Sequence, residues 1–176
     1  MALSKIDISK AGITGTLAAA NGGTGATSYS PGKVLQVLNT RNVTATNTSS
    51  TSYVDAGISQ AITPSSTSNK ILVLYTFGQS GTGASARDGY CTLLRDTTNL
   101  GSGGADNSAF TVKKGNASAN DYDLGDSIIY LDSPSSTSSL TYKIPVKVSN
   151  ADMTYNHNGD GSNDAEQSLT VMEISA

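Results

Sequence analysis

The sequence predicts an all-β protein, a jelly-roll-like β-sandwich of about eight strands that follows an extended N-terminal arm. Ser, Thr, Gly and Asn make up 78 of the 176 residues and Glu occurs only twice, so turn formers are abundant and straight-chain helix formers are scarce. Compact apolar runs recur along the chain and could close one core, which argues against disorder. Turn signals separate these runs, and this pattern favours sheet-on-sheet packing. A Greek-key sandwich of the immunoglobulin type is the alternative.

Residues 1–32 form the predicted arm, and residues 33–176 form the predicted head domain. In the arm, isolated apolar residues stand among small polar ones, and the final "SYSPG" is typical of a turn. Such a segment cannot bury its own backbone polar groups, so we expect it to lie on a partner or to wind with copies of itself. The expected contact points in the arm are Ile6, Ile8, Ile13 and Leu17.

The first half of the head contains four candidate strand regions. The first strand is expected within residues 33–43, and residues 52–63 form either a strand pair or one strand bent around Gly57. Residues 70–80 are apolar on both faces, which predicts a central strand covered on both sides. We expect residues 89–96 to form the strand beside it.

The second half continues the pattern. Residues 127–132 predict a short buried strand, and residues 153–158 and 168–175 complete the set. Residues 140–148 alternate between apolar and polar side chains, as one face of a half-buried strand requires. The shared apolar face consists of Leu140, Tyr142, Ile144, Val146 and Val148. Pro145 cannot donate a hydrogen bond to a neighbouring strand, which indicates an edge position or a bulge.

Two segments of the head resemble each other. Residues 62–75 and 132–144 each contain a Pro-Ser-Ser-Thr-Ser loop that leads into an apolar strand. A repeat architecture needs more copies at a fixed period. We therefore interpret the pair as two similar loops at corresponding ends of two strands.

Charge and cysteine usage restrict the partners. The net charge is −3 and the eleven Lys and Arg residues are scattered, whereas nucleic-acid binding needs clustered basic residues. No apolar stretch approaches the roughly 20 residues of a membrane span, and the first ten residues lack the apolar region of a secretory signal. We expect neither nucleic acid nor membrane as a partner. A single cysteine, Cys91, excludes an intramolecular disulfide and indicates synthesis in a reducing cytoplasm.

No catalytic residue is expected. The one histidine, His157, stands in a polar stretch, and the sequence contains no "GxSxG" nucleophile elbow. Cys91 lies within an apolar strand pattern and is expected to be a small buried hydrophobic residue. No organic cofactor is implied by any motif.

Calcium is the one metal that the sequence brings into question. Residues 158–166 carry side-chain oxygens at alternate positions, which resembles the start of a calcium loop. These positions are Asp160, Ser162, Asp164 and Glu166. The central Gly is absent, and Val171 stands where a bidentate Glu is required. Residues 121–126 hold three further carboxylates around a Gly. A solvated polar loop is the main interpretation of both segments, and calcium binding is the alternative.

Residues 13–38, "ITGTLAAANGGTGATSYSPGKVLQVL", closely resemble a segment of fibre proteins from tailed bacteriophages. In those proteins a "TGTLP-x-ANGGTG" shaft element precedes a distal β-domain. Residues 50–75, "LLRD" at 93–96, residues 130–144 and "SLTVMEI" at 168–174 are similar to phrases of one family of phage virion domains. The resemblance implies a homotrimer with a shaft-like arm and a β-sandwich head, and it brings no catalytic residues.

The resemblance predicts a non-enzymatic virion structural protein that is made in the host bacterial cytoplasm. Typical fibres run longer upstream, whereas only twelve residues precede Ile13 here. We therefore expect a trimeric capsid decoration (cement) protein or short head fibre, which docks on the major capsid protein or another virion protein through its arm. The alternative is a tail-fibre receptor-binding domain that recognises host cell-surface glycans through its loops. A polysaccharide depolymerase is a distant third.

Overall fold

The computed structural model describes residues 32–76, 79–82, 88–101, 110–114, 122–123, 127–149, 153–157 and 165–176. Residues 33–176 form one compact unit. The predicted arm contacts, Ile6, Ile8, Ile13 and Leu17, lie outside the described residues.

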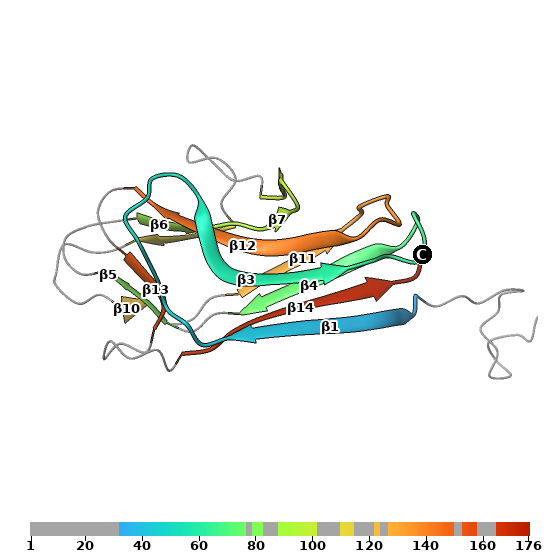
Figure 1. Cartoon of the computed structure of the whole chain (residues 1–176), viewed down its shortest axis with the longest axis horizontal. Helices are drawn as coiled ribbons and strands as arrows, with labels where there is room; N and C mark the ends of the chain where they lie inside the picture. Colours follow the sequence, from blue (N-terminus) through green and yellow to red (C-terminus); the bar gives the residue numbers. More distant parts are fainter. Residues whose placement is uncertain are drawn as a thin grey trace, which may run out of the picture. The chain divides into compact units, whose positions relative to one another are not determined.

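Eight principal strands build two antiparallel sheets. They are β1 (Val34–Asn42), β3 (Val54–Ile62), β4 (Lys70–Thr76), β6 (Asp88–Cys91), β9 (Thr111–Lys114), β11 (Ser127–Asp132), β12 (Leu140–Val148) and β14 (Gln167–Ile174). The first sheet has the order β1-β14-β4-β11, and the second has the order β3-β12-β6-β9. If these eight strands are numbered 1 to 8 along the chain, the first sheet has the order 1-8-3-6 and the second has the order 2-7-4-5. This is the strand order of a jelly roll. The predicted jelly-roll-like sandwich is confirmed (Figure 1).

Six short strands extend this framework. β7 (Leu94–Arg95) and β8 (Thr98–Asn99) form a hairpin beside β12. A small sheet has the order β10-β5-β13-β2 and consists of β10 (Tyr122–Asp123), β5 (Gln79–Thr82), β13 (Met153–His157) and β2 (Thr46–Thr48). Each strand of the small sheet is the neighbour in sequence of one strand of the first sheet: β2 follows β1, β13 precedes β14, β5 follows β4 and β10 precedes β11. Read from β2 to β10, the small sheet therefore repeats the order of the first sheet.

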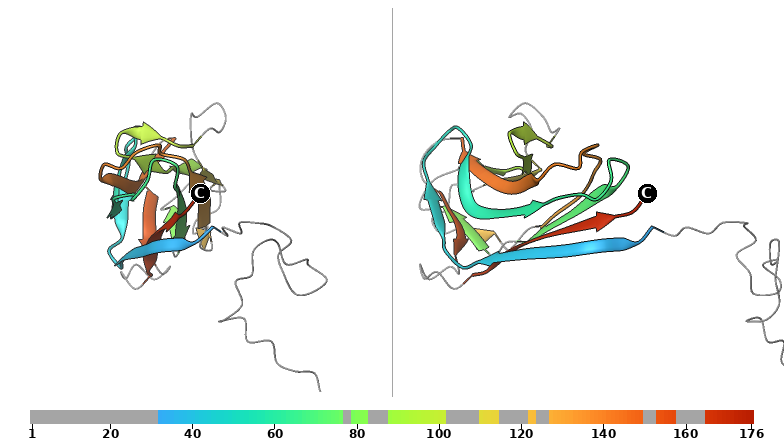
Figure 2. Two further views of the ribbon diagram at one scale, coloured as in Figure 1. Left: turned by 90° about the vertical axis from the view of Figure 1, so that its right-hand side faces the viewer. Right: turned by 45° about the vertical axis from the view of Figure 1, so that its right-hand side comes forward.

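The core lies between the two sheets, which Figure 2 shows as separate layers with β1 (blue) and β14 (red) on one side and β12 (orange) on the other. Alternate residues of each strand face it, as the pleat requires. All five residues of the predicted face of β12 are buried, and so is Cys91. The first sheet adds Ile71, Val73, Ile128, Leu169 and Val171, and β3 adds Ala56, Ile58 and Ile62.

β3 is one bent strand. Its pairing with β12 shifts between Lys143 and Pro145, where residues 56–58 of β3 have only Ile144 opposite them. Gly57 lies in this bulge with φ +76°, a backbone conformation that glycine adopts most readily. Pro145 therefore sits at a bulge, as predicted. It is not on an edge strand, because β12 has β3 on one side and β6 and β7 on the other.

Two expectations about neighbours and burial are wrong. Residues 89–96 do not lie beside residues 70–80, because β6 and β7 pair with β12 in the second sheet, while β4 has β14 and β11 as neighbours. The connection that follows β4 crosses to the opposite sheet, as most jelly-roll connections do, so closeness in sequence does not predict pairing here. β11 is also only half-buried, since it ends the first sheet and Ile129 is 70% exposed.

The two similar loops occupy the same end of the sandwich (Figure 1). Residues 63–69 lead from β3 to β4, and residues 133–139 lead from β11 to β12. Ile71 of β4 pairs with Asp132 of β11, and Ile62 of β3 pairs with Leu140 of β12. Each loop therefore crosses between the sheets at this end, in opposite directions.

Candidate association surface

The first sheet turns an apolar surface away from the core. On β4, Ile71 and Val73 point inward and are fully buried, whereas Leu72 and Leu74 alternate with them and are half-buried on the opposite side. The expectation that residues 70–80 are covered on both sides is therefore wrong for the described part of the chain. Both sides of β4 are apolar, and the core covers one of them.

A continuous apolar row crosses all four strands on this side. Leu72 lies directly opposite Leu131 on β11 and Met172 on β14. Met172 lies opposite Val37 on β1. Side chains that oppose each other on one face of a sheet are close enough to pack together. The row therefore forms one aliphatic strip across the sheet.

Further apolar residues flank this strip. Leu74 pairs with Ile129 on one side of the strip, and Ile174 pairs with Val34 on the other. Leu35 occupies a bulge of β1 and is 46% exposed. We call the whole set the outer face, and its members are Val34, Leu35, Val37, Leu72, Leu74, Ile129, Leu131, Met172 and Ile174.

The outer face collects most of the exposed apolar surface. Among the described residues, six large hydrophobic side chains are exposed, and five of them belong to the outer face. The sixth is Val43, which follows β1. Scattered surface hydrophobics are ordinary, whereas a contiguous group marks an interaction site.

Polar and charged groups border the outer face. The side-chain amide of Asn39 donates to Ser168 Oγ at 2.9 Å and to Thr170 Oγ1 at 2.8 Å. Beyond them, exposed Arg41 forms an ion pair with Glu166, and this contact raises the pKa of Arg41. At the opposite end, Lys70 Nζ donates to Ser133 Oγ at 2.8 Å. An apolar centre with a polar rim is typical of protein–protein contacts.

The first residue of the compact unit, Lys33, lies beside the outer face. Lys33 N donates to Ser175 Oγ at 2.8 Å, and Ser175 N donates to Lys33 O at 2.9 Å. Lys33 and Ser175 directly adjoin Val34 and Ile174, which pair across the outer face. Lys33, the first residue of the compact unit, is thus held next to the end of β14 by two hydrogen bonds.

A buried carboxylate organises the same end of the sandwich. Glu173 is 1% exposed, and its Oε1 accepts from Ser65 N at 2.6 Å, from Ser65 Oγ at 2.8 Å and from Asn69 Nδ2 at 2.6 Å. Gln36 Nε2 donates to Oε2 at 2.6 Å. Burial acts to raise the pKa of Glu173, but the hydrogen bonds outweigh it and lower that pKa to about 2. The carboxylate therefore stays charged and ties residues 63–69 to β14 and β1.

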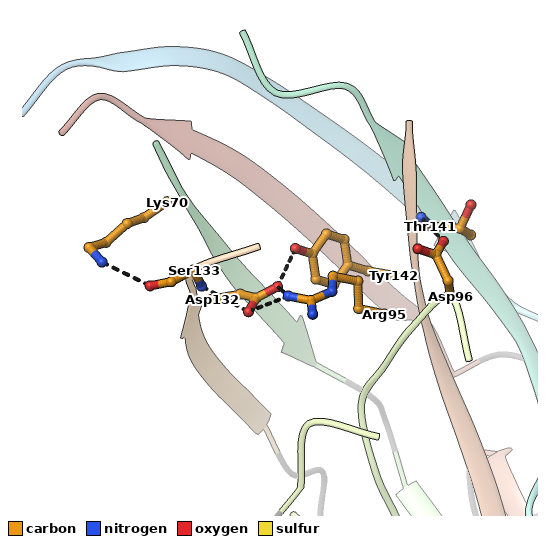
Figure 3. A network of polar contacts seen from close by, with 7 residues as sticks. All are labelled: Lys70, Arg95, Asp96, Asp132, Ser133, Thr141 and Tyr142. Carbon is orange, nitrogen blue, oxygen red and sulfur yellow. Dashed lines mark hydrogen bonds and ion pairs between the residues drawn. The ribbon is translucent and has the colours of Figure 1, made fainter. Parts of the chain in front are cut away.

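A second buried carboxylate joins the two sheets (Figure 3). Asp132 of β11 accepts from Arg95 Nη1 on β7 at 2.7 and 2.8 Å and from the Tyr142 hydroxyl on β12 at 2.6 Å. Ser133 N adds a further bond at 2.8 Å. Burial and this acceptor raise the pKa of Tyr142, and the ion pair outweighs desolvation to raise the pKa of Arg95. The network holds the β7–β8 hairpin against the first sheet.

Asp123 of the segment 121–126 belongs to β10, whereas Asp121 and Asp126 lie outside the described residues. Of the calcium candidates in residues 158–166, Glu166 alone lies within the described residues. Asp160 and Asp164 fall outside them, and Glu166 directs its carboxylate to Arg41. In the described part of the chain, no group of three or more His, Cys, Asp or Glu residues is placed to hold a metal ion. His157 belongs to β13 through its backbone pairing with Gln79.

The described residues contain no helix that is long and apolar enough to cross a membrane.

No protein-family model and no curated protein matches the chain. Among solved structures, the chain is similar to one described as the structure of infectious bursal disease virus Gx strain, with a TM-score of 0.31 and 9% sequence identity. The similarity covers 80% of this chain and 40% of the viral one, so the chain spans less than half the length of that protein.

Sequence reasoning missed the outer face and both buried carboxylates, although the signals are present. An apolar run on both sides of a strand is consistent with a covered strand, and equally with a strand whose second side awaits a partner. On β14 the residues 167, 169, 171 and 173 share the buried side. Glu173 falls on this buried side, and a buried carboxylate needs several hydrogen-bond donors.

Proposed function

We propose that this protein is a non-enzymatic structural protein of a bacteriophage virion. It is made in the host bacterial cytoplasm. On the particle surface it forms a trimeric capsid decoration (cement) protein or short head fibre. The observation that carries the proposal is the outer face, which joins nine aliphatic side chains on a sheet that already has a complete core on its other side. Such a surface is suited to contact with protein.

The N-terminal segment supports a virion role. Its "TGTLAAANGGTG" phrase resembles the shaft element of phage fibres, and that resemblance implies a homotrimer. Small residues allow three extended chains to approach closely and to satisfy one another's backbone groups. The arm then docks on the major capsid protein or another virion protein, and the jelly-roll head forms a surface knob.

The composition of the two similar loops supports decoration over glycan recognition. Sugar-binding and catalytic clefts use aromatic walls with a few convergent polar groups. Residues 63–69 and 133–139 contain Pro, Ser, Thr and Asn but no aromatic residue, and no aromatic is among the exposed large hydrophobics of the described residues.

Copy number on the particle tests the proposal. Averaged images of the virion should show many copies of the trimer on the capsid, and removal of the protein should lower the temperature at which the capsid opens. A handful of copies at the tail, together with glycan or cell binding by the protein, contradicts decoration and favours the tail-fibre alternative. Cleavage of host polysaccharide by the purified protein contradicts the non-enzymatic proposal.

The arm has a test of its own. We expect a variant that lacks residues 1–24 to keep the β-domain but to lose attachment to the particle. The measurement is co-sedimentation of the variant with particles that have been stripped of the native protein. Attachment equal to that of the full chain contradicts the docking role of the arm.

A further inference from the structure

We propose that the outer face is the surface on which copies of this chain meet, with the row formed by Leu131, Leu72, Met172 and Val37 at the centre of the contact. The inference rests on the trimer of the proposed function. It adds the location of the subunit interface on the head, which neither the fold nor the resemblance specifies.

The size of the outer face suits such a contact. Four strands about 4.8 Å apart and three rows about 6.7 Å apart give an apolar area of roughly 300–400 Å² once side chains are included. A standard interface buries about 800 Å² per partner. The outer face therefore provides the apolar centre, and polar neighbours such as Asn39 and Thr170 provide the surrounding rim.

The width of the outer face points to another sheet as its occupant. A single extended segment covers a track about 5 Å wide, whereas the outer face spans four strands in one direction and three rows of side chains in the other. One extended segment therefore leaves most of the outer face uncovered. Around a threefold axis, the apolar sheet faces of three copies can turn toward one another and bury their side chains in a common centre. Two further copies of this chain offer such faces.

The arm junction leads to the same conclusion. If arms from three copies wind together, their last residues lie close to one symmetry axis. Lys33 is fixed to Ser175 by two hydrogen bonds, so Val34 and Ile174 of each copy lie close to that axis as well. The end of the outer face that holds Val34 and Ile174 in each copy then contacts the same end in the two neighbouring copies.

The test places positive charges in the row of the full-length protein. Val37 is 52% exposed and Leu131 is 53% exposed, so Val37→Lys combined with Leu131→Lys disturbs the folded head little. Burial of unpaired charges at an interface is strongly unfavourable, so we expect association to weaken at least about a hundredfold. Val43→Lys is the matched control, because Val43 is also 52% exposed but lies off the outer face. Sedimentation velocity over a concentration series measures association.

The outcomes separate the interface from the proposed function. If the double variant associates as strongly as the native chain, the location of the interface is wrong while the trimer stands. If the native chain is monomeric throughout the series, the trimer and the interface are both wrong. Circular dichroism checks that the variants fold.

Oxidation of Met172 offers a measurement that needs no variant. Met172 lies in the centre of the proposed contact, so its reaction with hydrogen peroxide should be slower in the associated native chain than in the diluted, dissociated chain. Peptide mass spectrometry follows the product. Equal rates in an associated sample and a dissociated sample overturn the inference.

Discussion

The side-chain amide of Asn69 donates to the carboxylate of Glu173 at 2.6 Å, across 104 positions of the chain. This bond connects the end of the β3–β4 loop to the last part of β14, close to the C-terminus. Ser65 and Gln36 donate to the same carboxylate. One buried charge therefore fixes the loop, the edge strand and the terminal strand at the end of the sandwich where β1 begins and β14 ends.

The stability of the head should fall in acid through Glu173. Its pKa is lowered from 4.5 to about 2 in the folded protein, so the unfolded chain takes up the proton first as the pH decreases. This contribution to the free energy of unfolding is complete above about pH 5 and is lost between about pH 5 and 2, with a size on the order of 3 kcal/mol. Denaturant unfolding at several pH values measures it.

Glu173→Gln provides the comparison for that profile. The amide cannot carry the charge, so we expect lower stability at pH 7 and a shallower loss of stability between pH 5 and 2. Glu166→Gln is the control, because Glu166 is an exposed partner of Arg41 and exposed ion pairs contribute little. An unchanged acid profile in Glu173→Gln would contradict the assignment.

The two arginine ion pairs should differ strongly in their effect on stability. Arg95→Ala leaves the carboxylate of Asp132, which is 5% exposed, without its cation, and we expect destabilisation by about 3 kcal/mol. Arg41→Ala removes an exposed pair and should change stability by less than about 1 kcal/mol. Thermal unfolding of both variants gives the comparison. Equal effects would show that the Asp132 network does not hold the sheets together.

Gly57→Ala should destabilise the head through the backbone of the β3 bulge. Gly57 has φ +76°, and an added Cβ would meet Asn42 Nδ2 at 3.3 Å. We expect a loss of about 1–2 kcal/mol. Gly57→Asn introduces the same Cβ but tolerates positive φ better, so it should be less harmful. If the two variants lose equal stability, the contact with Asn42 and not the dihedral angle is responsible.

The two faces of the first sheet should respond differently to truncation. Ile71→Ala creates a cavity in the core, where Ile71 is fully buried, and should cost about 2–5 kcal/mol of stability. Ile129→Ala removes a side chain that is 70% exposed and should change the stability of the dissociated chain by less than about 0.5 kcal/mol. Denaturant unfolding at low protein concentration measures both. A large loss in Ile129→Ala would mean that the outer face is covered within the chain.

Local patterns were enough to predict much of the fold. The alternation in residues 140–148 identified the buried side of β12 because side-chain direction in a strand repeats every two residues. Pro145 indicated a bulge or an edge position because its nitrogen carries no donor, and the structure shows the bulge, with the bend at Gly57 opposite it. Each of these features depends on backbone chemistry within a few residues. The pairing of β6 and β7 with β12 was beyond such reasoning, because the jelly-roll connections separate strands that are adjacent in sequence.

By itself, the sequence determined an all-β sandwich with about eight strands, and it indicated where the chain bends and turns. Only the tertiary structure decided which of two apolar sides of β4 faces the core and which lies on the outer face. The reason is physical: a strand with leucines on one side and isoleucine and valine on the other satisfies burial in either orientation. The partners of Glu173 and Asp132 were likewise decided by the fold, since their donors come from distant strands and loops.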